Sequence, residues 1–277
     1  MVSVVGPIPI SVRRFPFSVL DVLLAVGKRT IALIAFFTLW ETYPRIWTED
    51  AVFLPPLSEV LASVADLAAS GDLVAHTEAS LGRSVSGFAI AVAVAVPLGL
   101  LIGWYRPLAT VLNPLLELFR NTAALALLPV FVLILGLGEV SKISIVLYAC
   151  AWPILLNTIS GVRDVDPLLV KSARSMGLSP VKLFVKVLLP AAVPTIFTGI
   201  RLAGAYSILM LIAAELMGAK EGLGYLITAS QSNFDIPAMY AGILTISAIG
   251  LVVNSALLLL ERRFSTWRTP TNGTRTS

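Results

Sequence analysis

The sequence predicts an all-α membrane protein with about six transmembrane helices. Of its 277 residues, 57% are hydrophobic and only 13% are charged, and the mean hydropathy is +0.90. This composition is typical of a chain that has the lipid bilayer as its solvent. The apolar residues are gathered in long runs, and the longest of these can cross a hydrocarbon core about 30 Å thick as a helix.

Six apolar segments follow one another along the chain, and 85–104 is the clearest. The first is the shortest, since a helix over 30–43 would cover only about 21 Å unless residues before it extended it. Pro107 and Pro114 precede the third segment and predict an interrupted span, and Pro153 predicts a break in the fourth. In order, the predicted spans are 30–43, 85–104, 123–137, 143–159, 194–217 and 239–260.

The basic residues predict the orientation of these spans. Of 20 Lys and Arg residues, 14 lie on the same side as both termini, three lie on the opposite side, and three lie within or at the edge of spans. Because cytoplasmic loops are enriched in positive charge, both termini are expected to be cytoplasmic. The chain then divides into a cytoplasmic interfacial segment, 1–29, a transmembrane domain, 30–263, and a cytoplasmic tail, 264–277.

The sequence contains no motif for catalysis or metal binding. It has no Walker-type glycine loop, no HExxH, no GxSxG and no cluster of His, Cys and carboxylate residues. The single cysteine, Cys150, and the single histidine, His76, are expected to be structural. Basic residues flank the membrane segments without aromatic interleaving, so nucleic acid is not an expected partner. The chain should therefore be non-catalytic, with no metal or cofactor of its own.

The longest polar and basic interruption, residues 166–194, predicts two short helices joined by a corner. Asp166 can cap the first helix, which has a proline in its first turn. Gly177 can end that helix because glycine reaches positive φ without steric cost. Ser179 is then expected to cap a second helix that starts at Pro180.

The second helix of this interruption is expected to be amphipathic and to lie at the membrane surface. Pro190 and Pro194 are expected to bend it into the next span. Its apolar face is formed by Val181, Phe184, Val185 and Leu188, and its basic face by Lys182 and Lys186.

At the corner, two apolar side chains are surrounded by positive charge. Met176 and Leu178 stand beside Lys171 and Arg174, which suits docking into a groove of a soluble partner. The alternative is a cytoplasmic loop that is basic only because such loops generally are. Local chemistry leaves both interpretations open.

Strongly polar side chains within or at the edge of spans are costly in lipid and therefore informative. Four are candidates for lining a translocation pathway, namely Arg120 and Asn121, which could attract an anion, together with Asn157 and Glu215. The alternatives are an interfacial position for Arg120 and Glu215 and helix packing for Asn157. Arg201 and Glu215 are about 21 Å apart along one predicted helix, so they are not expected to pair.

The stretch KSARSMGLSPVKLFVKVLLPAAVP resembles the ATPase-docking signature of ABC importer permeases. In that signature, Glu-Ala-Ala is followed three residues later by glycine and, after a spacer, by an apolar residue and Leu-Pro. Ala173, Gly177 and the Leu189-Pro190 pair match it, whereas Lys171 and Ser172 replace the glutamate and the first alanine. The resemblance extends from about residue 54 to residue 263. Over this range the chain is similar to the subgroup that imports aliphatic sulfonates, taurine, nitrate and bicarbonate.

This resemblance implies a type I ABC importer permease fold with a cytoplasmic coupling helix in loop 163–190. It also implies an inner-membrane location, a homodimer that forms the channel, an ATPase dimer that binds ATP and Mg, and an extracytoplasmic solute-binding protein. The ATPase-coupling residues would be Lys171, Ala173, Arg174, Met176, Gly177, Leu178, Ser179, Leu189 and Pro190.

A small anion such as a sulfonate, taurine or nitrate is the expected solute. The alternative function is a self-sufficient secondary transporter or channel for a small solute. Such a protein would not need the basic two-helix loop and should more often carry carboxylates within the membrane for ion coupling. Only Glu215 comes near that description.

Overall fold

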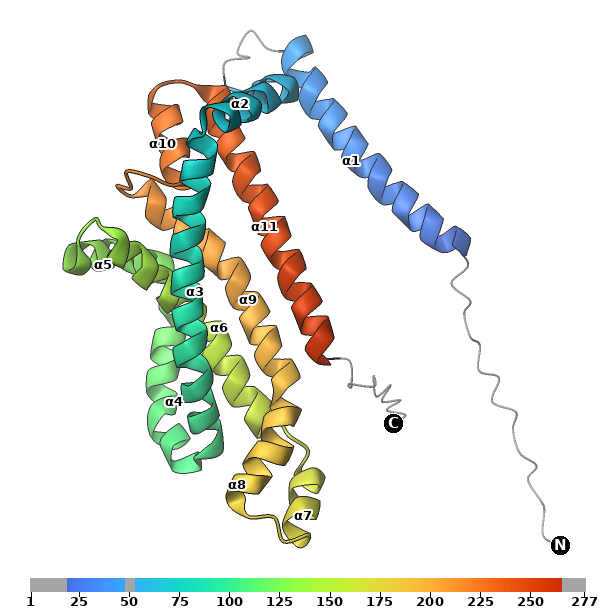
Figure 1. Ribbon diagram of the computed structural model, residues 1–277, viewed down its shortest axis with the longest axis vertical. Coiled ribbons are helices and arrows are strands. Elements are labelled where there is room, and N and C mark those ends of the chain that lie inside the picture. The colour runs from blue at the N-terminus through green and yellow to red at the C-terminus, as the bar shows by residue number, and fades with distance from the viewer. Residues whose placement is uncertain (1–18, 48–52, 266–277) are drawn as a thin grey trace, which may run out of the picture. The chain divides into compact units, whose positions relative to one another are not determined.

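The computed structural model describes residues 19–47 and 53–265, and these form helices joined by short connections, without a strand (Figure 1). The elements are α1 Val19–Trp47, α2 Leu57–Ser70, α3 Asp72–Trp104, α4 Arg106–Asn121, η1 Ala124–Leu127, α5 Leu128–Leu135, α6 Glu139–Arg163, α7 Pro167–Ser175, α8 Pro180–Leu183, η2 Phe184–Leu188, α9 Leu189–Leu216, α10 Leu223–Ser232 and α11 Ile236–Ser265. The all-α fold class is thus confirmed.

The described residues fall into two compact units, one up to Glu59 and one from Val60 onward. In the first unit, the end of α1 is tied to the start of α2 by polar contacts. The Trp40 indole donates to the Pro55 carbonyl at 3.2 Å, and the Glu41 carboxylate accepts from the backbone N–H of Ser58 at 2.9 Å. The predicted interfacial segment 1–29 lies largely outside the residues whose side chains are described.

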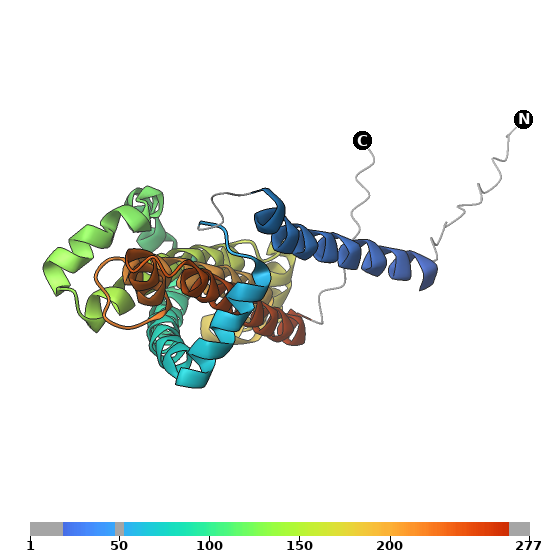
Figure 2. The same cartoon turned by 90° about the horizontal axis from the view of Figure 1, so that it is seen from above.

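Three helices form the centre of the second unit. α3, α6 and α9 run side by side, with α11 next to α9 (Figures 1 and 2). Their core contains small side chains that let the backbones approach closely, which is how membrane helices gain packing energy without a hydrophobic drive between them. Ala91 of α3, Cys150 of α6 and Ala203 of α9 are fully buried, and the Cys150 thiol lies 3.3 Å from the Ala203 carbonyl.

Glycines on α3 bring α6 close to it. A Cβ atom at Gly99 would lie 2.6 Å from the Cβ of Thr158, and one at Gly87 would lie 2.8 Å from the Cβ of Val146. Because real Cβ atoms essentially never approach so closely, these positions accept only glycine unless α6 moves. The close contact between α3 and α6 therefore depends on the lack of a side chain at Gly87 and Gly99.

Four helices of the described chain are long and apolar enough to cross a membrane, or five if one bent pair counts as a span. They are α3, α6, the helix Pro180–Leu216 and α11, and the bent pair is α4 with η1 and α5. α1, which contains the expected span 30–43, is not among them. The predicted total of about six is reached only when α1 and the bent pair both count.

The third predicted span is interrupted, but the prolines are not the cause. Pro107 lies in the first turn of α4, where no N–H is needed, and Pro114 lies inside a continuous helix. The chain turns by 83° after Asn121, where Thr122 and Ala123 are extended. Likewise Pro153 does not break the fourth span, because α6 continues through it to Arg163.

Replacing Gly99 with alanine should destabilise the protein by about 1–3 kcal/mol, because the added methyl overpacks the contact with Thr158. Gly82→Ala is the matched control, since Gly82 lies in the same helix and has no atom within 4 Å of the added Cβ. It should be neutral or stabilising by up to about 1 kcal/mol. Thermal unfolding of the detergent-purified variants measures the difference, and equal midpoints would refute close packing at Gly99.

Candidate functional site

The predicted corner is present between α7 and α8. The Asp166 side chain accepts from the backbone N–H of Leu168 at 2.8 Å and caps α7. After Met176 the chain turns at Gly177, whose φ is +75°. The N–H of Leu178 then reaches back to the carbonyl of Ala173 at 3.2 Å, which closes the helix end.

Ser179 stands at the start of α8 but does not cap it with its side chain. Its backbone carbonyl accepts from the N–H of Leu183 at 2.8 Å instead. The prediction of a serine side-chain cap was therefore wrong. Pro180 explains why the cap is dispensable, because a proline in the first turn removes one of the free N–H groups that a cap would satisfy.

The two prolines that were expected to bend the second helix leave it continuous. Residues 180–216 form one helical span of 37 residues that contains α8, η2 and α9. η2 is a π-helical turn in which the N–H of Leu189 bonds to the carbonyl of Phe184, five residues earlier. This wider turn precedes Pro190, which has no N–H to give to the preceding turn, and π-turns of this kind are frequent at functional sites. The helix is thus continuous through both prolines, with a change of helical register just before Pro190.

The corner has a packed underside and an exposed tip. Ala173, Leu183 and Leu188 are buried against each other, and Leu178 packs onto them half-buried. The Met176 side chain is 73% exposed. Of the two predicted apolar contact residues, Met176 is therefore free to meet a partner, whereas Leu178 mainly holds the corner to the long helix.

The remaining predicted coupling residues divide in the same way. The side chains of Lys171 and Arg174 are exposed around the tip, as is Ser179. Leu189 and Pro190 are half-buried within the long helix. The corner thus presents an exposed methionine together with two exposed basic side chains.

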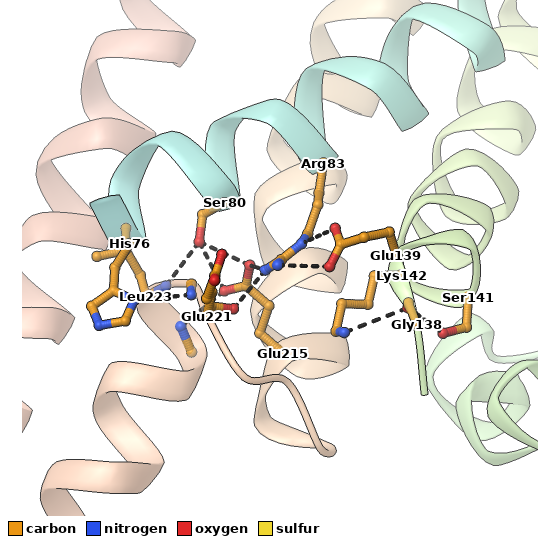
Figure 3. A network of polar contacts seen from close by, with 12 residues as sticks. His76, Ser80, Arg83, Gly138, Glu139, Ser141, Lys142, Glu215, Glu221 and Leu223 are labelled. Atoms are coloured by element: carbon orange, nitrogen blue, oxygen red, sulfur yellow. Dashed lines mark hydrogen bonds and ion pairs between the residues drawn. The ribbon is translucent and has the colours of Figure 1, made fainter. Parts of the chain in front are cut away.

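A buried ionic network lies where α3, α6 and α9 meet α10, at the other end of this unit from α7 and α8 (Figures 1 and 3). Arg83 of α3 is at its centre and is 5% exposed. Its guanidinium contacts Glu139 of α6 through two bonds, at 2.5 and 2.8 Å, and Glu215 of α9 at 2.7 Å. It also donates to the carbonyl of Glu221 at 2.7 Å. One side chain thus joins three helices and the connection before α10.

Glu215 is 1% exposed and is surrounded by donors. The Ser80 hydroxyl lies within 2.9 Å of both carboxylate oxygens, and the N–H of Gly224 donates to the carboxylate at 2.9 Å. A Cβ atom at Gly224 would lie 2.6 Å from the Cβ of Glu215, and one at Gly222 would overlap the carboxylate. Gly222 and Gly224 thus make room for this buried charge.

Two more side chains complete the network. The Nδ1 atom of His76 accepts from the N–H of Gly222 at 3.1 Å, so it anchors α3 to the loop before α10. Lys142 is 5% exposed, and its Nζ donates to the carbonyl of Leu137 at 3.0 Å. Buried Arg83 pairs with buried Glu215 and with Glu139, whose side chain is 58% exposed, and pairing is the condition under which buried ions are tolerated.

The four predicted pathway residues lie in three different places of the second unit. Arg120 and Asn121 are exposed at the end of α4, beside the 83° turn. The Asn157 side chain donates to the carbonyl of Pro153 at 2.8 Å and packs against Gly199, whose added Cβ would lie 2.7 Å from that of Asn157. Glu215 belongs to the buried network. Their role as a common pathway stays a prediction.

The pairing of Arg83 with Glu215 was not predicted from the sequence. The signal was present, because a lone arginine near the start of one span and a lone glutamate near the end of another are each costly unless they meet. The partner of Arg201 was also missed, since it pairs with Glu261 of α11 at 3.0 Å. That Arg201 and Glu215 do not pair was correctly expected.

Comparison with known proteins decides the family. Residues 95–266 match the model of the binding-protein-dependent transport system inner membrane component. The chain belongs to this family. The permease is 35% identical to a probable ABC transporter permease of Brucella abortus, with coverage of 79% of this chain and 87% of the relative. It is 31% identical to the taurine transport system permease of Escherichia coli, with 92% of each chain covered.

A third relative, a putative aliphatic sulfonates transport permease of Bacillus subtilis, is 32% identical over 85% of each chain. Among solved structures, the permease resembles a chain of the MetNI methionine ABC transporter in an inward-facing conformation, with a TM-score of 0.56 and 19% identity. That match covers 67% of this chain and 93% of the other. It places the permease fold beyond doubt and agrees with the predicted fold class.

Replacing Glu215 with glutamine should destabilise the permease by about 3 kcal/mol, because buried Arg83 loses half of its ionic partners. Glu78→Gln is the control, since Glu78 is an exposed acid on α3, one turn from the network. It should change the free energy of unfolding by less than about 0.5 kcal/mol. Denaturant titration in detergent measures both, and a Glu215→Gln protein as stable as the control would contradict the ionic role.

Proposed function

We propose that this permease is the channel-forming subunit of an ATP-driven importer and that a separate ATPase docks on the corner around Gly177. The exposed Met176 tip, with exposed Lys171 and Arg174 on the adjoining helix α7, supports this proposal above all. Protein interfaces commonly have an apolar centre and a polar rim, and an exposed methionine beside basic side chains fits that pattern. Because Lys171 stands where the family signature has glutamate, the facing residue of the ATPase should be acidic.

The long helix offers a means of transmission. At about 1.5 Å per residue, the 37 residues from Pro180 to Leu216 extend some 55 Å. The corner lies at its start, and Glu215 lies at its end in the network with Arg83. A force on the corner would therefore reach the packed ends of α3, α6 and α10 through one element, as rigid-body switching between two states requires.

The proposed subunit is non-catalytic. ATP and Mg would be bound by the ATPase dimer, and this chain would contribute no cofactor. Energy would enter only as a difference in the affinity of the partners for the two conformations.

The assembly would contain two copies of this chain in the inner membrane, with an extracytoplasmic solute-binding protein on the side of the Arg83 network. Both termini and the corner would then be cytoplasmic, as the distribution of Lys and Arg predicts. The Arg120 and Asn121 side chains, exposed in the single chain, would be available to line a pathway between the two copies.

The proposed solute is a small anion of the sulfonate, taurine or nitrate kind. The taurine and aliphatic sulfonate permeases among the relatives support this class. The structure around Glu215 argues against the alternative function, a secondary transporter. Its carboxylate is already neutralised by Arg83 and held by Ser80 and Gly224, so it is not free to couple an ion.

Gly177→Trp should abolish co-purification of the ATPase, because the bulky side chain both strains a positive φ and obstructs the corner. Gly71→Trp is the matched control, since Gly71 has a φ of +86° and, like Gly177, no atom within 4 Å of an added Cβ. Both variants should lose about 1–2 kcal/mol of stability, but only Gly177→Trp should lose the ATPase. Retention of the ATPase and of solute uptake by Gly177→Trp would reject the docking proposal.

A strain that lacks this gene should fail to grow on taurine or an alkanesulfonate as sole sulfur source, because the deletion removes the proposed channel through which the anion enters the cell. Plasmid-borne wild-type permease should restore growth and the uptake of radiolabelled taurine, whereas the Gly177→Trp form should not. Growth of the deletion strain on both sulfur sources would reject the sulfonate class and leave nitrate or bicarbonate as the cargo.

A further inference from the structure

We propose that the end of the permease that carries α7 binds an anionic phospholipid, with the phosphate on three arginines and the acyl chains beside Trp104. This site shares Arg174 with the proposed coupling corner at Met176, but it does not require the ATPase. Two grooves in the second unit carry the proposal, one basic and one apolar, and Trp104 lines both.

The basic groove has a volume of about 460 Å³ and lies between α4, the end of α6 and α7. Arg106, Arg163 and Arg174 line it, together with Thr110 and Asn113. Within the part of the chain that the structure describes, none of the three guanidinium groups forms an ion pair. Planar guanidinium groups bind phosphate oxygens through paired hydrogen bonds, so the groove offers an unfilled phosphate site.

The nearby carboxylates do not neutralise these arginines. Asp164, next to Arg163 in the chain, accepts from the Ser160 hydroxyl at 2.7 Å. Asp166 accepts from the N–H of Leu168 at 2.8 Å and caps α7. In the described part of the chain, neither acid lines the groove or forms an ion pair with its arginines.

The basic groove lies at the ends of the membrane helices, which is where a lipid headgroup would be. Arg106 follows the end of the apolar helix α3 by two residues, and Arg163 is the last residue of the apolar helix α6. Trp104 and Tyr105 lie at the same end, and such aromatic side chains are enriched where the membrane meets water. Basic pockets between membrane helices at this level are typical binding places for anionic headgroups.

The apolar groove supplies a place for a hydrocarbon chain. It has a volume of about 440 Å³ and is lined by Pro97, Leu100, Leu101, Trp104, Tyr105, Pro180, Val181 and Phe184. Trp104 packs edge-to-face against Phe184, with ring centroids 5.2 Å apart. This contact holds in place the Trp104 side chain, which lines both grooves. A soluble anion would fill the basic groove alone, whereas a phospholipid would fill both, and this favours the lipid.

The test uses the full-length permease in detergent without the ATPase and measures binding of phosphatidylglycerol and phosphatidylcholine by native mass spectrometry. Arg106→Gln/Arg163→Gln should weaken phosphatidylglycerol binding by roughly 30-fold, because each arginine near an anionic lipid contributes about five-fold. Phosphatidylcholine binding should stay unchanged. Arg262→Gln is the matched control, since Arg262 is an exposed arginine at the end of α11 that lines neither groove, and it should bind both lipids normally.

Unchanged phosphatidylglycerol binding by the double variant would overturn the proposal, as would an equal loss in Arg262→Gln. Full competition by inorganic phosphate would assign the groove to a soluble anion. Loss of ATPase co-purification by the double variant, with phosphatidylglycerol binding intact, would assign it to an acidic side chain of the partner. Thermal unfolding in phosphatidylcholine checks that the double variant is folded, and its midpoint should equal that of the wild type.

Discussion

The contact of Arg83 with Glu139 and Glu215 is the constraint on which the second unit depends. Arg83, Lys142 and Glu215 are withdrawn from water there, and each would be costly alone, whereas the Glu139 side chain is 58% exposed. With Glu139, they join helices that are far apart in the sequence. The need to accommodate the buried Glu215 carboxylate also explains nearby uncharged residues. Gly222 and Gly224 leave space for it, and Ser80 donates a hydrogen bond to it. An ionic centre thus defines a helix junction in a chain that is otherwise held by small apolar contacts.

Much of the fold could be predicted from the sequence, because lipid leaves helices as the natural solution for long apolar runs. The corner could also be predicted, since Asp166 and Gly177 act through their immediate neighbours. Local rules did not reveal the π-turn just before Pro190, and the helix stays continuous through both Pro190 and Pro194.

The candidate site shows the same division. The exposure of Met176 follows from a corner that the sequence encodes locally, whereas the packing of Leu178 depends on Leu183 and Leu188 beneath it. The pairing of Arg83 with Glu215 joins residues on two helices whose register no local pattern reveals. Even so, the cost of an isolated charge in lipid is a sequence-level reason to look for a partner of each intramembrane ion.

The single cysteine has a practical consequence for watching this protein move. Cys150 is fully buried between α6 and α9, so its thiol is shielded from reagents in the folded chain. Cysteines introduced at Met176 and near Glu221 could therefore carry spin or fluorescent probes without removal of a native thiol. The distance between two such probes would show directly whether the helix from Pro180 to Leu216 moves as one rigid rod during a transport cycle.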